Sequence, residues 1–214
     1  MLQDELISVG RELYERGMQT TRSGNISARD GDSFLITRTG TNLGRLAPSD
    51  LISVALDPAV AIPAGASCEA AVHRAIYNAS GAGAVVHAHP PYAIALAHTI
   101  RAGGVTPIHN EALVGLKWIP VIDTSVHGRE GGEEPRGIAE QLASWCSLIV
   151  RGHGAFSTGA SLSDALYKMF LLDDVCRISV IVQSIRREKE PEFVVAGKPA
   201  RIKQRRVKSA PAIR

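Results

Sequence analysis

The residues of this sequence best suited to chemistry are two histidines, His87 and His89, at the end of an apolar run. Two valines precede them and favour an extended backbone, in which residues two apart point to the same face, so the two imidazoles should lie side by side. Two prolines follow and cannot continue a hydrogen-bonded ladder, which puts the pair at the end of its strand. Such a pair can chelate a metal ion or be two ordinary hydrogen-bonded histidines, and both interpretations stay open on these residues alone.

A third histidine, His153, has a comparable setting. It lies between two glycines, just after the apolar segment Ser147–Val150, which predicts a buried strand. Glycine neighbours leave its backbone free to bend toward a close partner, which makes His153 the best candidate for a third ligand. His73, in contrast, falls inside a predicted helix and is expected to be a packed or hydrogen-bonded histidine.

Glu69 is the carboxylate that a helix would bring toward these histidines. Ser67 is a good N-cap, and Val72, Ile76 and Ala79 form an apolar stripe, so the sequence predicts a helix with Glu69 in its first turn. A carboxylate there can simply complement the helix dipole, at a gain of a few tenths to about 1 kcal/mol. The functional interpretation is that it is aimed from the helix start at the histidine strand.

Two turns rich in small polar residues could bind an anion. The stretch Thr20–Arg29 contains a Gly-Asn pair, and the predicted strand Phe34–Thr37 leads into a second turn, Arg38–Asn42. Successive backbone N–H groups in such turns converge on an anion, although either stretch can also be only a turn.

The rest of the chain predicts alternating helices and strands. An opening helix from about Asp4 to Arg16 is ended by Gly17, and Ser163 is expected to cap a long apolar helix from Asp164 to about Ile185. Between them the sequence predicts strands at Leu51–Leu56 and Trp118–Ile122 and helices at Tyr92–His98 and from Pro135 to about Trp145.

The composition is that of one ordinary globular domain. The chain has 214 residues, of which 45% are hydrophobic and 21% charged, and no Pro/Gly/Ser-rich linker separates two cores. No apolar run approaches the roughly 20 residues that a membrane helix needs, and the N-terminus lacks a signal-peptide pattern, so we expect a cytoplasmic protein. Three cysteines without Cys-x-x-Cys spacing argue against both a disulfide framework and a Cys-rich zinc site.

The net charge of +3 is concentrated in a C-terminal tail. Residues 186–214 contain ten Lys or Arg and three Glu, giving +7 there and −4 for residues 1–185. A basic tail can bind nucleic acid. This one has a single aromatic residue, Phe193, and no helical charge stripe, which favours a solvated or subunit-bridging extension beyond a catalytic domain of residues 1–185.

Five short motifs follow one another along the chain: Ser-Gly-Asn, Ile-Thr-x-Thr-Gly, Ser-x-Glu, His-x-His and Gly-His-Gly. In this order and spacing they resemble the class II aldolase and adducin family, and most of all its fuculose-1-phosphate aldolase branch, from about residue 5 to 185. The resemblance implies an α/β fold, a three-layer α/β/α sandwich around a mixed, largely antiparallel sheet. It also implies a homotetramer with active sites between subunits.

The resemblance assigns roles to particular residues. It makes Glu69 the catalytic glutamate, which can also bind the metal. It matches the metal-binding histidines to His87, His89 and His153, and the substrate phosphate site to Asn25, Thr39, Gly40 and Ser67. Three imidazoles and a carboxylate suit Zn²⁺, and Mn²⁺ or Fe²⁺ fits the same donor set.

Two positions depart from the aldolase pattern. Cys68 replaces a phosphate-site serine, and Asn110 stands where the aldolases carry a catalytic tyrosine. The adjacent Glu111 is similar to the acid/base glutamate of methylthioribulose-1-phosphate dehydratases.

The resemblance implies metal-dependent cleavage of a ketose 1-phosphate to dihydroxyacetone phosphate and an aldehyde. The metal would polarise the carbonyl, so no Schiff-base lysine is required, and Glu69 would move the proton. Dehydratase, sugar-phosphate epimerase and decarboxylase activities are the alternatives on the same fold. An adducin-like binding domain is the alternative outside enzymes, but adducins lack the metal-binding histidines.

Overall fold

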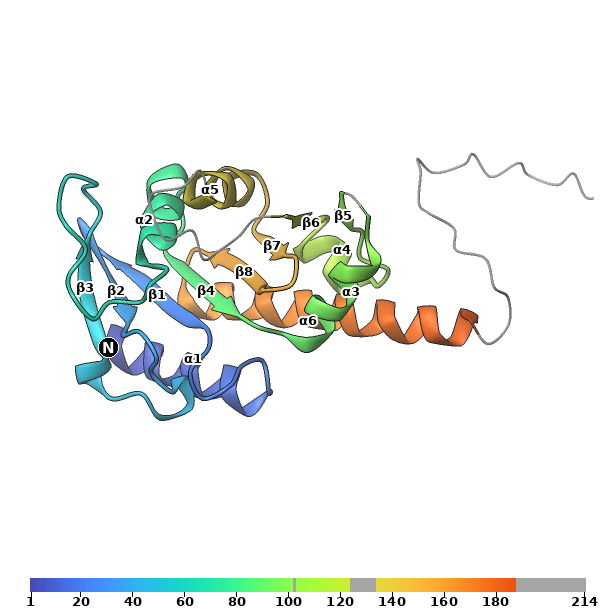
Figure 1. Cartoon of the computed structure of the whole chain (residues 1–214), viewed down its shortest axis with the longest axis horizontal. Coiled ribbons are helices and arrows are strands. Elements are labelled where there is room, and N and C mark those ends of the chain that lie inside the picture. The colour runs from blue at the N-terminus through green and yellow to red at the C-terminus, as the bar shows by residue number, and fades with distance from the viewer. Residues whose placement is uncertain (102, 124–133, 188–214) are drawn as a thin grey trace, which may run out of the picture.

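The computed structural model describes residues 1–101, 103–123 and 134–187 (Figure 1). The strands in these ranges are β1 (Asn25–Asp30), β2 (Ser33–Thr37), β3 (Leu51–Ala55), β4 (Ala84–Ala88), β5 (Gly104–Val105), β6 (Ile119–Ile122), β7 (Ser147–Val150) and β8 (Gly154–Gly159). The α-helices are α1 (Leu2–Glu15), α2 (Ala70–Ala79), α3 (Pro91–Thr99), α4 (Asn110–Gly115), α5 (Glu134–Ser144) and α6 (Leu162–Arg187).

The strands form one sheet in the order β3-β2-β1-β4-β8-β7-β6-β5. Neighbouring strands are antiparallel throughout, except that β6 and β7 are parallel. Helices α2 and α5 pack together over one face, and the long helix α6 crosses the other face together with α1, α3 and α4 (Figure 1). This is the predicted three-layer, largely antiparallel α/β/α sandwich, so the fold prediction is confirmed.

Strand β4, at the centre of the sheet, sets the direction in which the first histidine points. All five of its residues are buried. Ala84, Val86 and Ala88 belong to the core on the α1 and α6 side, whereas Val85 belongs to the core under α2 and α5. Because side chains alternate along a strand, His87 points with Val85 toward α2.

Helix ends differ from the prediction by a few residues. The opening helix is confirmed, and Gly17 has the left-handed backbone (φ +70°) of a C-terminal cap. Helix α2 begins later than predicted, with Glu69 itself at the N-cap position and Ser67 Oγ accepting the Glu69 N–H at 3.3 Å. Helix α6 begins at Leu162 instead, before the predicted cap, because Ser161 Oγ accepts a first-turn N–H.

The sequence prediction misses two central strands. It treats Thr20–Arg29 as a turn, but the turn ends at Gly24 and the rest is β1, paired on both sides by β2 and β4. It leaves β8 unassigned because Gly-Ala-Phe-Ser-Thr-Gly contains few strand-forming residues. Every residue of β8 is nevertheless buried, since β4 and β7 flank it, and tertiary pairing decides its conformation.

Within the described ranges no helix is both long enough and apolar enough to cross a membrane. The basic extension from residue 188 onward lies outside the described residues. The division into a domain of residues 1–185 and a tail therefore stays a prediction.

Candidate metal centre

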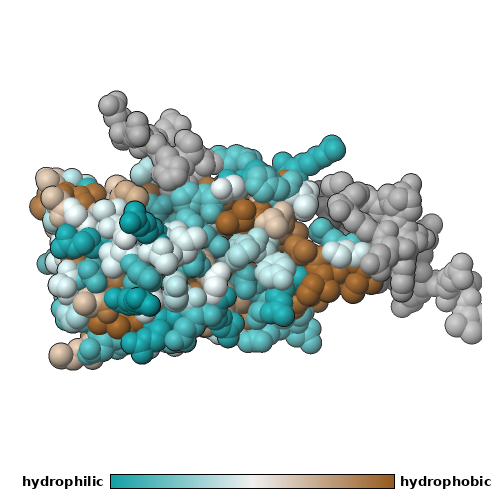
Figure 2. Space-filling model, turned by 60° about the horizontal axis from the view of Figure 1, so that its bottom comes forward, coloured by the Kyte–Doolittle hydropathy of each residue, from teal (hydrophilic) through white to brown (hydrophobic). Residues whose placement is uncertain are grey.

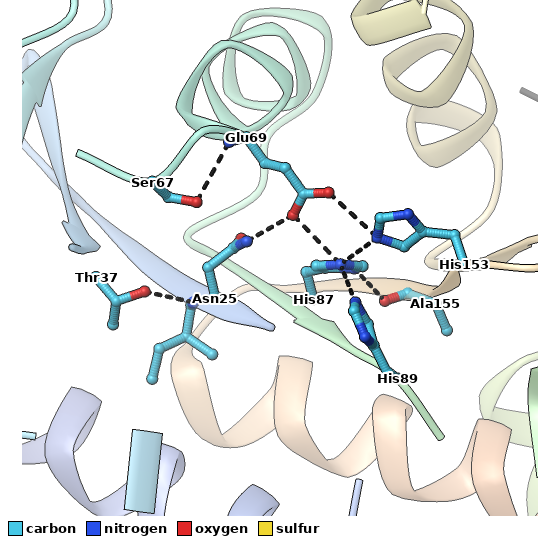
Figure 3. Close-up of polar contacts among 9 residues, drawn as sticks. Asn25, Thr37, Ser67, Glu69, His87, His89, His153 and Ala155 are labelled. Carbon is cyan, nitrogen blue, oxygen red and sulfur yellow. Dashed lines mark hydrogen bonds and ion pairs between the residues drawn. The ribbon is translucent and has the colours of Figure 1, made fainter. Parts of the chain in front are cut away.

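Three histidines from two parts of the sheet meet at one point (Figure 3). His87 lies on β4, His89 follows the strand, and His153 lies in the turn between β7 and β8. His87 Nε2 is 3.0 Å from His153 Nε2 and 3.0 Å from His89 Nε2. Because β4 pairs with β8, residues 66 positions apart become neighbours. The predicted ligands thus converge through their Nε2 atoms.

The environment of His87 leaves its Nε2 lone pair available. The Nδ1 atom lies 2.9 Å from the Ala155 carbonyl, which can only accept, so Nδ1 carries the proton. Burial lowers the pKa of His87, the carboxylate of Glu69 opposes this, and His153 adds to the lowering, so the net direction is down. The neutral imidazole with a free Nε2 is the form that binds a metal ion.

Glu69 closes the cluster from the side of α2 (Figure 3). Its Oε2 lies 3.2 Å from His87 Nε2, and its Oε1 lies 3.4 Å from His153 Nε2. Asn25 Nδ2 donates to the same Oε2 at 2.5 Å. Burial raises the pKa of Glu69, but its electrostatic interaction with His87 and its hydrogen-bonding contacts with His153 and Asn25 outweigh this effect, and the net pKa is well below the ordinary value. The carboxylate is therefore ionised.

This donor set fits a divalent metal ion. Two nitrogens that each bind one ion at about 2.0–2.1 Å are roughly 2.9–3.4 Å apart at bond angles of about 90–110°. The measured separations of the Nε2 atoms fall in this range. The ligand atoms of the three histidines all lie within 4.8 Å of each other. Lone pairs that converge in this way repel one another unless a cation or a proton lies among them.

The cluster forms the floor of an open cavity of about 170 Å³. The four residues predicted to bind phosphate all line this cavity beside the histidines and Glu69: Asn25, Thr39, Gly40 and Ser67. They come from the start of β1, the turn after β2 and the segment before α2. The two predicted turns and the predicted metal ligands therefore share one pocket.

Glycine is required where the first turn approaches the metal strand. Gly24 has a left-handed backbone (φ +74°), and a Cβ there would lie 2.9 Å from the His87 carbonyl oxygen and closer still to the Gln19 side chain. Gly40 also has positive φ, at +68°, with open space around it. The bare backbone at both positions faces the region where an anion would bind.

Glu111 is the one predicted site residue that the fold does not bring to the cavity. It lies on α4, its side chain is exposed, and it accepts a hydrogen bond from the Tyr167 hydroxyl of α6 at 3.1 Å. His73 is also separate, as predicted. It is fully buried, and its Nδ1 lies 2.7 Å from Ser27 Oγ, which in turn lies 2.7 Å from the Tyr77 hydroxyl.

Sequence reasoning missed two arginines, Arg22 and Arg38, which also line the cavity. Arg22 directly precedes Ser-Gly-Asn, and Arg38 is the variable residue of Ile-Thr-x-Thr-Gly. A basic residue next to an expected anion-binding turn was the available signal.

The fold and this cluster agree with comparisons to known proteins. The family described as "Class II Aldolase and Adducin N-terminal domain" matches residues 4–180, and the chain belongs to this family. Its relatives include lyases, and it belongs with the class II aldolase enzymes of this family.

Particular relatives carry different activities in their names. The L-fuculose-1-phosphate aldolase of Thermus thermophilus superposes with a TM-score of 0.80 at 33% identity, covering 90% of this chain and 98% of that one. The L-fuculose phosphate aldolase of Methanococcus maripaludis is 30% identical over 184 residues, 85% of this chain and 98% of its own. A probable bifunctional methylthioribose-1-phosphate isomerase/methylthioribulose-1-phosphate dehydratase of Nocardia farcinica is 30% identical over 190 residues. That match covers 81% of this chain but only 34% of the relative, so this chain corresponds to about a third of that protein.

Proposed function

We propose that the protein is a metal-dependent lyase that cleaves a ketose 1-phosphate to dihydroxyacetone phosphate and an aldehyde. The observation that carries this proposal is the single cavity in which a metal-type donor set and neutral anion-binding groups lie side by side. Lyase relatives of both the aldolase and the dehydratase kind are consistent with it.

In this proposal His87, His89, His153 and Glu69 hold one divalent cation, with Zn²⁺ as the first choice and Mn²⁺ or Fe²⁺ as alternatives. When bound, the cation acts as a Lewis acid that polarises the ketose carbonyl and stabilises the enediolate left by bond cleavage. The chain supplies the geometry. The Ala155 carbonyl orients the His87 ring, and Phe156 stacks on that ring with centroids 4.1 Å apart.

Glu69 is proposed to move the proton. Its carboxylate lies between the histidines and Asn25 in the cavity. With its pKa tuned toward neutrality in the loaded site, it would accept the hydroxyl proton whose loss starts retro-aldol cleavage. The same oxygen can then return a proton to the enediolate carbon. Asn25 keeps Oε2 oriented, because its amide can only donate through Nδ2 at 2.5 Å.

The phosphate is proposed to bind between the two polar turns. Ser67 Oγ accepts the Glu69 N–H and still has its own hydroxyl hydrogen to donate. Gly40 offers bare backbone, and Thr39 a hydroxyl, from the neighbouring segment that lines the same cavity. The start of α2 adds the positive end of a helix dipole to this region.

A homotetramer with active sites between subunits is proposed from the uncovered apolar surface. Val114 of α4 is 81% exposed, and Leu113, Ile181 and Ile185 are also substantially exposed. Figure 2 shows hydrophobic side chains gathered toward the C-terminal end of α6. Burial of this surface by a second copy would also cover α4, the helix that carries Glu111, and could bring Glu111 to a neighbouring cavity.

A dehydratase is the second candidate, because Glu111 occupies the segment where the aldolases carry a tyrosine and because relatives bear that name. The test is a panel of ketose 1-phosphates incubated with metal-loaded protein, with products identified by NMR. An aldehyde plus dihydroxyacetone phosphate supports the aldolase. A dehydrated diketone phosphate, with a larger loss of rate in Glu111→Gln than in Glu69→Gln, supports the dehydratase. Absence of turnover across the panel contradicts both.

A further inference from the structure

Two guanidinium groups in the cavity wall have no role in the proposed reaction. Arg22 and Arg38 both line the cavity, and both side chains are exposed to solvent. Among the described residues neither side chain has a hydrogen-bond or ion-pair partner. The sole acidic residue of the cavity lining is Glu69, whose carboxylate is already engaged by the histidines and Asn25.

The two arginines reach the cavity from the same end of one hairpin. Strands β1 and β2 pair with Ser27 opposite Ile36, and continuing this register places Asn25 opposite Arg38. Arg22 precedes Asn25 by three residues, in the turn that enters β1. The antiparallel pairing of β1 and β2 therefore brings the two segments that carry these arginines to the same end of the hairpin, where both line the cavity.

Arg38 is also held in place by its surroundings. Its backbone N–H donates to the Asp50 carbonyl at 2.7 Å, and it forms an isolated bridge with Ala66. Its guanidinium lies against the bare Cα of Gly65, where a Cβ would come within 2.5 Å of Nη1. This contact restricts the Arg38 side chain without neutralising its charge.

Guanidinium groups add a property that the neutral donors lack. Neutral hydroxyl and amide N–H groups select an anion mainly by where its acceptor oxygens lie. The attraction of a guanidinium, in contrast, increases in proportion to the charge of the anion. Its planar fork also matches two oxygens of one phosphate. A cavity with two unpaired guanidiniums should therefore distinguish a dianion from a monoanion of the same shape.

We propose that Arg22 and Arg38 are specificity-determining residues that bind the phosphate monoester of the substrate as a dianion and set the preference of this cavity for a dianion over a monoanion. The inference rests on the proposed phosphorylated substrate. It adds two residues, and a charge requirement, to the neutral phosphate site.

Methyl phosphate and methyl sulfate provide the test, because they have nearly the same shape and differ by one charge. Above pH 7.5 a phosphate monoester is largely a dianion, since its second pKa is about 6. The dissociation constants of both anions are measured by NMR titration on the metal-loaded full-length protein. We expect the unmodified protein to bind methyl phosphate about tenfold or more tightly than methyl sulfate, as one charge-assisted hydrogen bond would give.

Arg22→Met and Arg38→Met should each weaken methyl phosphate binding about tenfold and methyl sulfate binding much less, and the double variant should bind the two anions about equally. Arg38→Lys should retain part of the preference, because it keeps the charge but loses the fork. Two controls separate this effect from general damage. Arg45→Met changes an exposed arginine outside the cavity and should alter neither constant. Thr39→Val removes a neutral donor and should weaken both anions by the same factor.

The inference is overturned if the double variant keeps its preference within about twofold, or if the unmodified protein binds neither anion at tens of millimolar. These measurements require no turnover, so they separate the two proposals. Loss of the preference in a protein that cleaves no ketose phosphate would support the arginine site and contradict the proposed reaction. Cleavage of a ketose phosphate by a double variant whose preference for the dianion is unchanged would support the proposed reaction and contradict the arginine site.

Discussion

His73 and His87 are both fully buried on the α2 side of the sheet, and both lie against the ring of Phe156. They differ in the surroundings of their ring nitrogens. His73 Nδ1 is paired with Ser27 Oγ, and its Nε2 has no partner among the described residues. His87 Nδ1 is paired with a backbone carbonyl, and its Nε2 faces two other imidazoles and a carboxylate.

Burial alone therefore does not identify a metal ligand. Burial lowers the pKa of both histidines, to about 3 for His73, and keeps both neutral. His87 differs because its Nε2 lone pair and those of neighbouring ligand atoms converge on one point. If no proton lies among them, a metal cation is needed to offset their mutual repulsion. His73 belongs to a structural hydrogen-bond network, in which its loss should affect folding and not metal binding. The following changes test this distinction.

The largest effect should come from removing a ligand. Even outer-shell partners of a metal ligand cost about 10–100-fold in affinity when changed, so His87→Ala or His153→Ala should weaken metal binding about 1,000-fold or more. Competition with a chromogenic chelator measures the affinity. His73→Gln is the matched control and should bind metal as the unmodified protein does. Equal losses in His73→Gln and His87→Ala would remove the distinction between them.

Glu69→Gln should give the next largest effect, on turnover. The amide keeps the size of the side chain and can still accept from Asn25 through its oxygen, but it cannot take a proton. We expect kcat to fall about 10²- to 10⁴-fold. Because the three histidines remain, most of the metal should be retained, which elemental analysis checks. An unchanged kcat in a metal-loaded Glu69→Gln variant would exclude Glu69 as the base.

Asn25→Ala should have an intermediate effect, mainly on substrate binding. It removes a cavity donor and the hydrogen bond that orients Glu69. The loss of one charge-assisted hydrogen bond should raise KM for a phosphorylated ketose about 10- to 100-fold. KM for the unphosphorylated ketose should change much less. Equal changes for the two substrates would show that Asn25 does not contact the phosphate.

Local sequence could predict the separate motifs of the site but not how the fold brings them together. His87 and His89 were identifiable as candidate ligands because two valines and two prolines specify a strand end within a few residues. His153 was identifiable because glycines flank it after an apolar run. Each of these patterns is local, so it can be recognised without knowledge of the fold. The separate metal-ligand and turn motifs could be named, but their meeting in one cavity depends on β1 pairing with β4 and β4 with β8.

Features set by long-range pairing were missed for the same reason. Strand β8 has little intrinsic strand preference and is fixed by its two neighbours. One miss was local: Glu69 was expected in the first helical turn, whereas its N–H bonds to Ser67 Oγ and it lies at the N-cap. Glu111 was predicted from its place in the sequence alone, which does not show where the fold puts its side chain. In a single chain it lies at the surface next to Tyr167.

The smallest effect should be on stability at His73. Losing the hydrogen bond to Ser27 in His73→Gln should cost about 1–3 kcal/mol of unfolding free energy at pH 8. The variant should also change the acid response. Burial lowers the pKa of His73 from 6.5 to about 3, against the opposing charge of Glu69, so between these pH values the unfolded chain binds a proton that the folded chain does not. Stability therefore falls as the pH falls through this window, by at most about 1.4 kcal/mol per pH unit for this group.

Urea unfolding of the metal-free protein at several pH values between 3.5 and 8 measures this slope. It should be shallower in His73→Gln than in the unmodified protein. The remaining slope should come mainly from His87 and, at the acid end of the range, from Glu69, because the pKa of each is lowered in the folded protein. Identical slopes in the two proteins would mean that His73 is protonated in the folded state.

The central claim is that three histidines form a metal centre, and anomalous X-ray diffraction from crystals of protein purified without chelator tests it most directly. We expect about one equivalent of a divalent transition metal per chain by elemental analysis. We also expect an anomalous peak about 2.0–2.3 Å from Nε2 of His87, His89 and His153 at the absorption edge of that metal. No peak among these nitrogens in protein supplied with zinc, manganese or iron, together with less than about a tenth of an equivalent of any of them, would contradict it.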